Sequence, residues 1–432
     1  MKKFGLFTML LLLMLTSCQD DECKTSKEVF QYDPVYKTLE EIEKPEIKVD
    51  ISRAIKNPGK VYYIGNTLFV SEIGEGVHII DNTDKSNPVP LSFLEIPGNI
   101  DVSFRGNSLI ADSYFNILFI DISDLDNPVV TSSINDIKKQ YYHFDKEKEA
   151  YIVDYTLSKV HRDLPCNHPF FSNPNRYYYD DVSVYSNVKD GNVFNDVFTE
   201  GGFSPNTSGG SPGVAGSNSS FALVGDYFYF IHRSEVEVYN ITDVDSPIFS
   251  HGFTVDWNIE TLFPYEDKLF IGGRTGMYIY DNSDPSEPVY LSEFNHARAC
   301  DPVFVVGKTA YVTLSSGTRC QNFNNQLDVI DISNILAPVL IESYPMYRPK
   351  GLSIYDNTLF LCDDKAGLKI FDVSDNTMIK ENKLSAIKGH TFIEVIHTSP
   401  TEIMVIGPDG IFQYDVSDNS NPKLLSQMNI ED

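Results

Sequence analysis

The chain has 432 residues, with 61 acidic and 34 basic residues and a net charge of −27. So acidic a surface argues against binding to nucleic-acid backbone or to anionic lipid head groups, because like charges repel. It suits cationic partners or neutral ones such as glycans. Aromatic residues make up 12% of the chain, and Val, Ile, Thr and Tyr recur in short runs, so strands are favoured over helices.

Residues 1–17 contain the three parts of a secretory signal peptide. Two lysines precede an apolar run from Phe4 to Leu15, which is shorter than the roughly 20 residues that a membrane span needs. Leu15-Thr16-Ser17-Cys18 resembles the bacterial lipobox, which implies cleavage before Cys18 and lipidation of its sulfur. An ordinary signal with an incidental cysteine is the alternative. Removing residues 1–17 takes away two lysines and no acid, so the net charge changes from −27 to −29.

Residues 18–45 are mostly polar and charged, and they are predicted to form a lipidated acidic tether between membrane and domain. Gln19-Asp20-Asp21-Glu22 resembles the surface-export signal of Bacteroidetes lipoproteins. The resemblance implies an outer-membrane lipoprotein that is exposed at the cell surface and held to the membrane by its lipid. A solvated acidic spacer is the simpler interpretation of the same residues.

A repeated phrase dominates the rest of the chain: a short strand that ends at Asp or Asn, followed by a turn rich in Asx, Ser and Pro. One copy runs from Gly76 to Asp84 and ends at Asn87-Pro88. A hairpin precedes each copy, for example Val61–Ile64 and Thr67–Val70 around Gly65-Asn66. These hairpins begin near residues 59, 100, 140, 221, 259, 302, 350 and 391.

A unit of three or four short strands every 40 residues buries its faces only against neighbouring units. Radial stacking of such units is the β-propeller solution, so the fold class is predicted to be an all-β propeller over residues 46–432. Eight blades are favoured, and seven with a larger insertion is the alternative. The third unit has lost its terminal phrase and is followed by an insertion at 164–220. The strand Glu46–Ile51 or the final strand Leu424–Ile430 would complete the last blade.

The phrases Val329-Ile330-Asp331-Ile332-Ser333 and Phe371-Asp372-Val373-Ser374-Asp375 resemble the LVIVD repeat of bacterial and archaeal cell-surface proteins. The likeness covers about residues 58–432, with a break at 164–220. It implies a propeller at the cell surface. Because most of that family has no assigned molecular function, it implies no ligand.

Loops that lead into the inner strand of each blade converge around the central channel, where a ligand is commonly bound. These loops are polar in this sequence, and the alternative is a rim that is merely wet. The candidate binding residues are Asn99, Asp101, Asn258, Glu260, Arg298, Asp301, Arg348, Lys350 and His390. The Tyr-rich and Gly/Ser-rich insertion offers a second candidate surface.

Five cysteines follow Cys18, an odd number that leaves at least one unpaired. Cys300 and Cys320 flank one hairpin and are the candidate disulfide, with two separately buried thiols as the alternative. Cys362 is predicted to be a buried apolar residue. Cys23 and Cys166 pair or stay free.

The sequence has no recognisable catalytic motif, and no metal ligand or cofactor is predicted. The Asp residues that end each phrase are expected to close turns on their own backbone rather than to bind calcium. The predicted function is a surface-anchored binding or scaffold module for a glycan or protein ligand, with no nucleic acid as partner. The alternative is a hydrolase or lyase that acts on a glycan in the central funnel.

Overall fold

The structure is a computed structural model that describes residues 24–137, 139–165, 214–215, 220–256, 259–273, 275–295, 302–315 and 325–431. The chain divides into two compact units: Met1–Thr38 with Tyr142–Asn187, and Leu39–Tyr141 with Val188–Asp432. In the described part of the chain, no helix is long and apolar enough to cross a membrane. Only α2 (Leu39–Glu43) and a 3₁₀ turn, η1 (Lys139–Tyr141), interrupt the β-structure described there.

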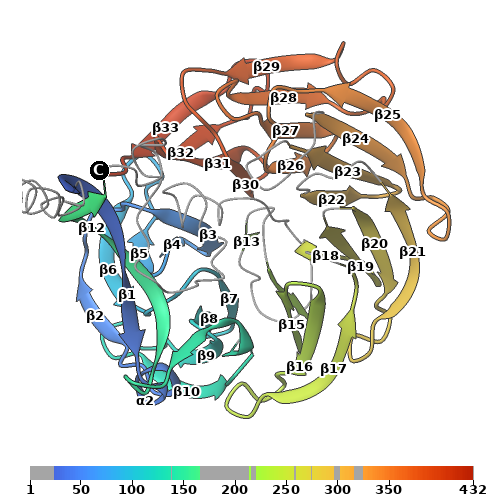
Figure 1. Cartoon of the computed structure of the whole chain (residues 1–432). Helices are drawn as coiled ribbons and strands as arrows, with labels where there is room; N and C mark the ends of the chain where they lie inside the picture. The colour runs from blue at the N-terminus through green and yellow to red at the C-terminus, as the bar shows by residue number, and fades with distance from the viewer. Residues whose placement is uncertain are drawn as a thin grey trace, which may run out of the picture. The chain divides into compact units, whose positions relative to one another are not determined.

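The larger unit is a ring of seven antiparallel sheets, and the four strands of each blade come from one continuous stretch of chain (Figure 1). In the first sheet, the short strand β13 (Val214–Ala215) also pairs with β3. Within a blade the strands pair in chain order from the centre of the ring outward. The first blade consists of β3 (Pro58–Ile64), β4 (Thr67–Glu72), β5 (Gly76–Asp81) and β6 (Val89–Glu95). The second consists of β7 (Val102–Arg105), β8 (Ser108–Ser113), β9 (Asn116–Asp121) and β10 (Val129–Ile134). The third consists of β14 (Phe221–Val224), β15 (Tyr227–His232), β16 (Glu235–Asn240) and β17 (Ile248–Thr254).

The remaining four blades repeat the same order. The fourth blade consists of β18 (Ile259–Tyr265), β19 (Lys268–Gly273), β20 (Gly276–Asp281) and β21 (Val289–Asn295), and the fifth of β22 (Val303–Val306), β23 (Thr309–Leu314), β24 (Gln326–Asp331) and β25 (Val339–Pro345). The sixth consists of β26 (Leu352–Tyr355), β27 (Thr358–Cys362), β28 (Leu368–Asp372) and β29 (Lys383–Ile387). The seventh consists of β30 (Glu394–Ser399), β31 (Glu402–Gly407), β32 (Gly410–Asp415) and β33 (Lys423–Met428). The prediction of an all-β propeller is confirmed.

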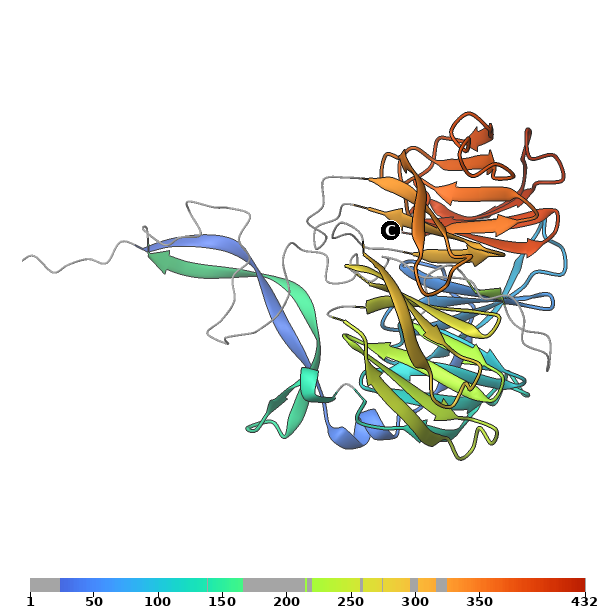
Figure 2. The same ribbon diagram turned by 90° about the vertical axis from the view of Figure 1, so that its right-hand side faces the viewer.

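The third predicted unit, which begins near residue 140, forms a sheet but does not form a blade of this ring. Its strands β11 (His143–Asp145) and β12 (Ala150–Pro165) belong to the smaller unit, where β12 pairs with β1 (Lys24–Lys37) (Figure 2). The eight units therefore give eight sheets, seven of which are blades, in agreement with the seven-bladed alternative. The physical reason is the lost terminal phrase: without an Asx turn and an outer strand, this unit has no means of completing a blade.

The predicted tether also contains regular structure, because β1 and α2 occupy most of residues 24–43. β1 and β12 pair from Lys24↔Pro165 to Lys37↔Tyr151, with one bulge at Val35/Tyr36. The larger unit begins at Leu39, and β11 and β12 belong to the smaller unit. A strand pairing over so long a sequence distance is not visible in the composition of either segment alone.

Two successive Asx turns follow the third strand of every blade. In the first blade, the Asp81 carboxylate accepts the Thr83 N–H at 2.9 Å and the Asp84 carboxylate accepts the Ser86 N–H at 3.0 Å. The same pair of turns occurs at Asp121/Asp124, Asn240/Asp243, Asp281/Asp284, Asp331/Asn334, Asp372/Asp375 and Asp415/Asp418. Hydrogen bonds from the Thr83 hydroxyl and N–H hold the pKa of Asp81 below its usual range. The expectation that these residues close turns is confirmed.

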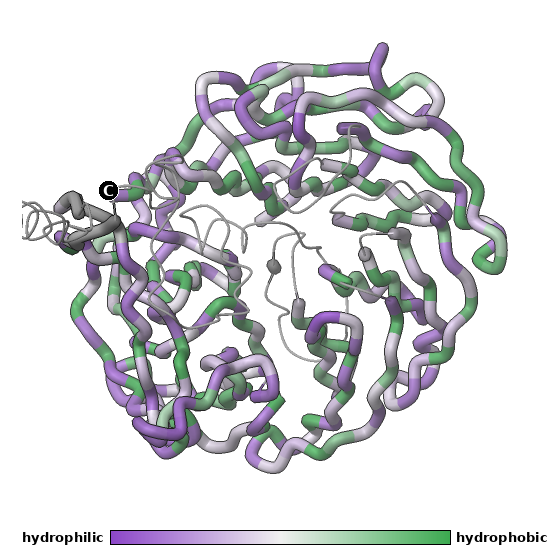
Figure 3. Tube along the Cα trace, in the orientation of Figure 1, coloured by the Kyte–Doolittle hydropathy of each residue, from purple (hydrophilic) through white to green (hydrophobic). Residues whose placement is uncertain are grey.

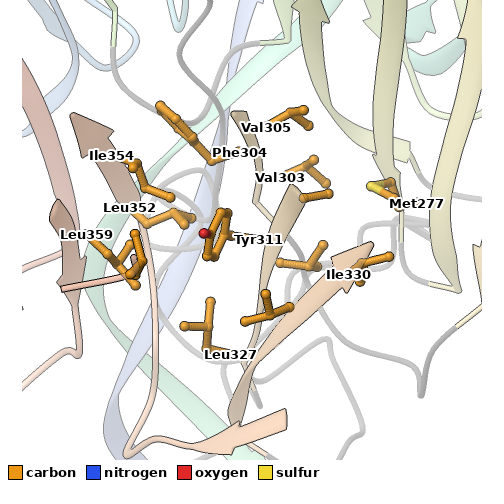
Figure 4. Packing of buried hydrophobic residues seen from close by; sticks show 14 of the residues in the cluster. Met277, Val303, Phe304, Val305, Tyr311, Leu327, Ile330, Leu352, Ile354 and Leu359 are labelled. Carbon is orange, nitrogen blue, oxygen red and sulfur yellow. The ribbon is translucent and has the colours of Figure 1, made fainter. Parts of the chain in front are cut away.

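The hydrophobic core lies between neighbouring blades. Figure 4 shows one such region, where Tyr311 and Leu327 of the fifth blade pack beside Leu352 and Leu359 of the sixth. Polar contacts add to this packing: the Tyr311 hydroxyl donates to Asn376 Oδ1 at 2.7 Å, across the same boundary. Each blade therefore depends on its neighbour for burial, which explains why the sequence repeats as a whole unit.

The ring closes between its first and last blades without sharing a blade between the chain ends. β33 completes the last blade, as one of the two predicted closures requires, while β2 (Lys48–Ile51) adds to the outer edge of β6. Ile55 forms a parallel bridge with Ile430, and the Glu431 N–H donates to the Ile55 carbonyl at 2.8 Å.

A buried amide pair stabilises this closure. Asn82 Nδ2 donates to Gln413 Oε1 at 2.9 Å, and Gln413 Nε2 donates to Asn82 Oδ1 at 2.7 Å, with both side chains almost fully buried. Replacing either residue with alanine removes both of these hydrogen bonds and leaves a buried amide atom of the other without its partner, although Gln413 Nε2 keeps its hydrogen bond to the Ser426 hydroxyl at 3.1 Å. Each single change is therefore expected to lower the free energy of unfolding by about 2 kcal/mol. The double variant should lose less than the sum of the two. Urea unfolding of all four proteins measures this coupling, and strict additivity would contradict it.

Candidate functional site

The candidate rim consists of the loops that lead from the outer strand of one blade into the innermost strand of the next. The structure describes Asn99, Asp101, Glu260, Arg348, Lys350 and His390 of the predicted residues. Asn258, Arg298 and Asp301 lie outside the described residues, as do both members of the predicted disulfide, Cys300 and Cys320. The lipidation site Cys18, Cys23, Cys166 and most of the insertion 164–220 also lie outside them.

Asn99 and Asp101 lie together at the entrance to the second blade, and both are buried. Asn99 Nδ2 donates to the Asp101 carbonyl at 2.9 Å and to Asp112 Oδ1 at 3.1 Å. Asp101 Oδ2 accepts the N–H and the hydroxyl of Ser220 at 3.0 and 2.9 Å. Asp101 therefore links the second blade to the residue that precedes the third, which is a structural role.

Lys60, on β3 of the first blade, approaches the same group, with its Nζ 3.9 Å from Asp101 Oδ2. Burial lowers the pKa of Lys60, while the nearby charges of Asp101, Glu394 and Asp112 act in the opposite direction. Because Glu394 is on β30, residues of the first, second and last blades meet here. Lys60 and Glu394 were not among the predicted site residues, since nothing in their local sequence marks them.

Arg348 and Lys350 precede the innermost strand of the sixth blade. Arg348 is half-exposed, and its guanidinium lies 3.1 Å from the carboxylate of Asp364. Lys350 is mostly buried, and its backbone N–H donates to the Cys362 carbonyl at 2.7 Å. Asp363 accepts the N–H groups of Tyr347 and Arg348 at 3.0 and 2.8 Å and forms an ion pair with Lys369.

A buried carboxylate that accepts two consecutive backbone N–H groups recurs in three blades. Asp363 has this arrangement, Asp112 accepts from Ile100 and Asp101 at 2.7 and 2.9 Å, and Glu72 accepts from Lys56 and Asn57. Each is at the end of the second strand and fixes the loop into the innermost strand. Sequence reasoning assigned no role to Glu72 or Asp363, although an acid at the end of each second strand could have indicated one.

Glu72 also accepts a hydrogen bond from the buried ring of His78, whose Nε2 lies 2.8 Å from its carboxylate. Burial alone raises the pKa of Glu72, but the bonds from His78, Lys56 and Asn57 hold it below its usual range. A carboxylate held in this way stays ionised and does not exchange protons near neutral pH.

His390 and Glu260 are the remaining predicted rim residues that the structure describes. His390 is half-exposed, its Nδ1 lies 3.9 Å from Asp409 Oδ2, and its ring lies 4.5 Å from that of Phe412. Glu260 is half-buried on β18. In the described ranges, no group of three or more His, Cys, Asp or Glu side chains could hold a metal ion. Cys362 on β27 is fully buried, as predicted, and burial raises the pKa of its thiol well above the usual value.

Two stretches, residues 298–345 and 349–383, match the family model described as LVIVD repeat. The chain carries LVIVD repeats. The matched stretches include the fifth blade and most of the sixth, and LVIVD repeats are typical of β-propeller proteins. No curated protein is similar enough to the chain to count as a match.

Among solved structures, the computationally designed protein Ika8 is similar over 89% of this chain and 91% of its own, with a TM-score of 0.50 and 9% identity. Hsv2 of Kluyveromyces lactis covers 87% of this chain and 100% of its own, with a TM-score of 0.44 and 11% identity. BamB from Moraxella catarrhalis covers 84% and 85%, with a TM-score of 0.45 and 8% identity. At these identities the likeness concerns the fold alone.

A buried histidine between the sixth and seventh blades is expected to make the stability of the ring depend on pH. Burial lowers the pKa of His397 to about 4, and its Nδ1 contacts the Ser353 hydroxyl at 3.0 Å. Because the unfolded chain protonates this ring near pH 6.5, stability is expected to fall by up to about 3 kcal/mol as the pH drops from 6.5 to 4.

Urea midpoints measured across this range, with the His397→Gln and Ser353→Ala variants beside the parent, check the assignment. His397→Gln should flatten the profile between pH 6.5 and 5, whereas Ser353→Ala, which keeps the buried ring of His397, should keep the slope of the parent. An unchanged slope in His397→Gln would contradict the assignment.

Proposed function

We propose that this chain is a lipid-anchored lipoprotein of the Bacteroidetes type, whose propeller binds a glycan or protein ligand, or serves as an assembly scaffold, without catalysis. The propeller fold and the LVIVD repeats are consistent with a binding or scaffold module. The ligand, the anchor and the cell-surface location are parts of the proposal.

The proposal that the protein is not a catalyst rests on the hydrogen bonds that three buried carboxylates make near the rim. Asp112, Asp363 and Glu72 each accept two backbone N–H groups and thereby hold the loops into the innermost strands. General acid–base catalysis needs a group poised near the working pH and within reach of substrate. The low pKa of Glu72 runs against that requirement.

The anchor is supported by the residues around Cys18 and by the strand that begins shortly after them. The signal-like residues 1–17 and the acidic residues 20–22 are sequence features, and β1 begins six positions after Cys18. A paired strand of 14 residues is about 45 Å long. This strand occupies most of the chain between Cys18 and Leu39, where the larger unit begins.

Incubating the mature chain with a glycan array and with candidate surface proteins, with mass spectrometry of each ligand afterwards, tests the proposal. We expect retention of a ligand whose mass does not change. Arg348→Ala and His390→Ala should weaken retention if the rim takes part. Lys308→Ala, on the turn between β22 and β23, is the matched control. Release of ligand fragments would overturn the non-catalytic proposal in favour of a hydrolase or lyase.

A further inference from the structure

The outermost strands of the third, fourth and fifth blades each begin with two exposed apolar residues. These six side chains are between 43% and 64% exposed. They are Ile248 and Phe249 on β17, Val289 and Tyr290 on β21, and Val339 and Leu340 on β25. Exposed apolar residues are common one at a time, but a repeated set on adjacent elements marks an interaction surface. Hydrophobic stretches are visible on outer as well as inner strands of the ring (Figure 3).

Hydrogen bonds between blades join these strands into one surface. The Ser250 hydroxyl of β17 donates to the Ser286 carbonyl at 3.0 Å, just before β21. The Ser292 hydroxyl of β21 donates to the Ile335 carbonyl at 2.5 Å, just before β25. Leu336 beside this second contact is 63% exposed and extends the same surface. We call the six paired residues together with Leu336 the apolar wall.

The outer edges of three other blades are protected in ways that the apolar wall is not. β29 and β33 begin with Lys383 and Lys423, and charged residues at strand edges prevent unwanted pairing. The edge of β6 is covered by β2. In the described part of the chain, β17, β21 and β25 are the last strands of their sheets and carry neither device. β10 of the second blade lacks both devices as well, but only the first of its two leading valines, Val129, is exposed. The contrast indicates that the wall is kept open for a partner.

The charge around the wall indicates what kind of partner this is. The three hairpins that carry it, residues 235–254, 276–295 and 326–345, contain eleven acidic residues and no lysine or arginine. Glu293 and Glu342 are exposed on the same outer strands. An apolar strip framed by carboxylates complements a surface that has apolar side chains between cationic ones. A second copy of this chain would place its own acidic side chains against these carboxylates, and like charges repel.

We propose that the apolar wall binds a basic protein segment that carries apolar side chains between lysines or arginines. The inference rests on the proposed binding function and names the partner class and the surface. Apolar side chains of the segment would cover the aromatic rings of Phe249 and Tyr290, and its cations would face Glu293 and Glu342.

The probe is a synthetic 12-residue peptide of alternating lysine and valine, with an alternating glutamate and valine peptide for comparison. Calorimetry with the full mature chain at low salt should show binding of the lysine peptide only, weakened by added salt. The triple variant Phe249→Ser, Tyr290→Ser, Leu340→Ser should weaken binding at least tenfold. The matched triple Val129→Ser, Leu384→Ser, Leu424→Ser, at corresponding outer-strand positions of other blades, should change it less than twofold.

Equal loss in both triples, or no preference for the lysine peptide, would overturn the proposal. A dimer in sedimentation that only the wall triple dissociates would also overturn it, since the occupant would then be a second copy. Should the wall triple unfold, Tyr290→Ser alone, with an expected threefold loss, decides between the same outcomes. If the lysine peptide does not bind, the ligand retention expected in the array experiment is unaffected. If the array experiment releases ligand fragments, the non-catalytic proposal fails, but the peptide experiment still tests the apolar wall.

Discussion

Replacing Gly76 with alanine is expected to lower the free energy of unfolding of the ring by about 3 to 5 kcal/mol. Gly76 begins β5 with φ +147°, a conformation that L side chains rarely adopt. A Cβ atom there would lie 1.9 Å from the Leu94 carbonyl oxygen and 2.8 Å from the Ile96 nitrogen, so strand β6 would have to move. The same approach recurs at Gly367, where a Cβ would lie 2.0 Å from the Ile387 carbonyl oxygen.

Gly65→Ala is the matched control for this change. Gly65 also has positive φ, +60°, but a Cβ there would meet nothing within 4 Å. Its replacement should cost only about 1 kcal/mol, because backbone strain is present without a clash. Urea unfolding followed by circular dichroism gives both values. Equal losses in the free energy of unfolding for the two substitutions would contradict the prediction, because the contact of a Cβ at residue 76 with β6 would then have no energetic cost.

Replacing Cys18 with serine is expected to abolish lipid attachment to the protein. A hydroxyl does not take the place of the thiol in thioether formation, so neither the diacylglycerol nor the cleavage that depends on it would occur. Stable anchoring requires more than one acyl chain, and under the proposal all of them are on this residue. Labelled palmitate incorporation and cell fractionation measure the effect, with Cys362→Ser as the control that should keep full incorporation.

Residual palmitate on Cys18→Ser at the level of the parent would contradict the assignment of this cysteine. Loss of palmitate with full retention in the membrane fraction would mean that something other than lipid holds the chain there. Because Cys362 is fully buried in β27, its serine variant separates a general effect of cysteine removal from the specific one.

The blade pattern was predictable because its signals are local. The hairpin around Gly65-Asn66 and the Asx turns at Asp81 and Asp84 depend only on residues a few positions apart. The same local signals misassigned the third unit, because its strand β12 pairs with β1, more than 100 residues earlier in the chain. Nothing in the short-range pattern distinguishes a strand that joins a ring from one that pairs elsewhere.

The rim was predictable only in part, for a similar reason. Asn99 and Asp101 were selected as ligand-binding candidates, but the structure uses both as internal hydrogen-bond partners. Lys60, the ion-pair partner of Asp101, comes from another blade, and Glu394 near it comes from the far end of the chain. How much bonding capacity such a residue keeps for a ligand depends on contacts between distant segments: Asn99 Nδ2 is bonded, whereas its buried Oδ1 has no hydrogen-bond partner.

Treating intact cells with an external protease is the most direct test of whether a lipid anchor presents this propeller outside the cell. We expect the ring to be removed from whole cells while a periplasmic control protein survives, and Cys18→Ser cells to have little cell-bound protein to remove. Protection of the protein until the outer membrane is broken would contradict its exposure at the cell surface.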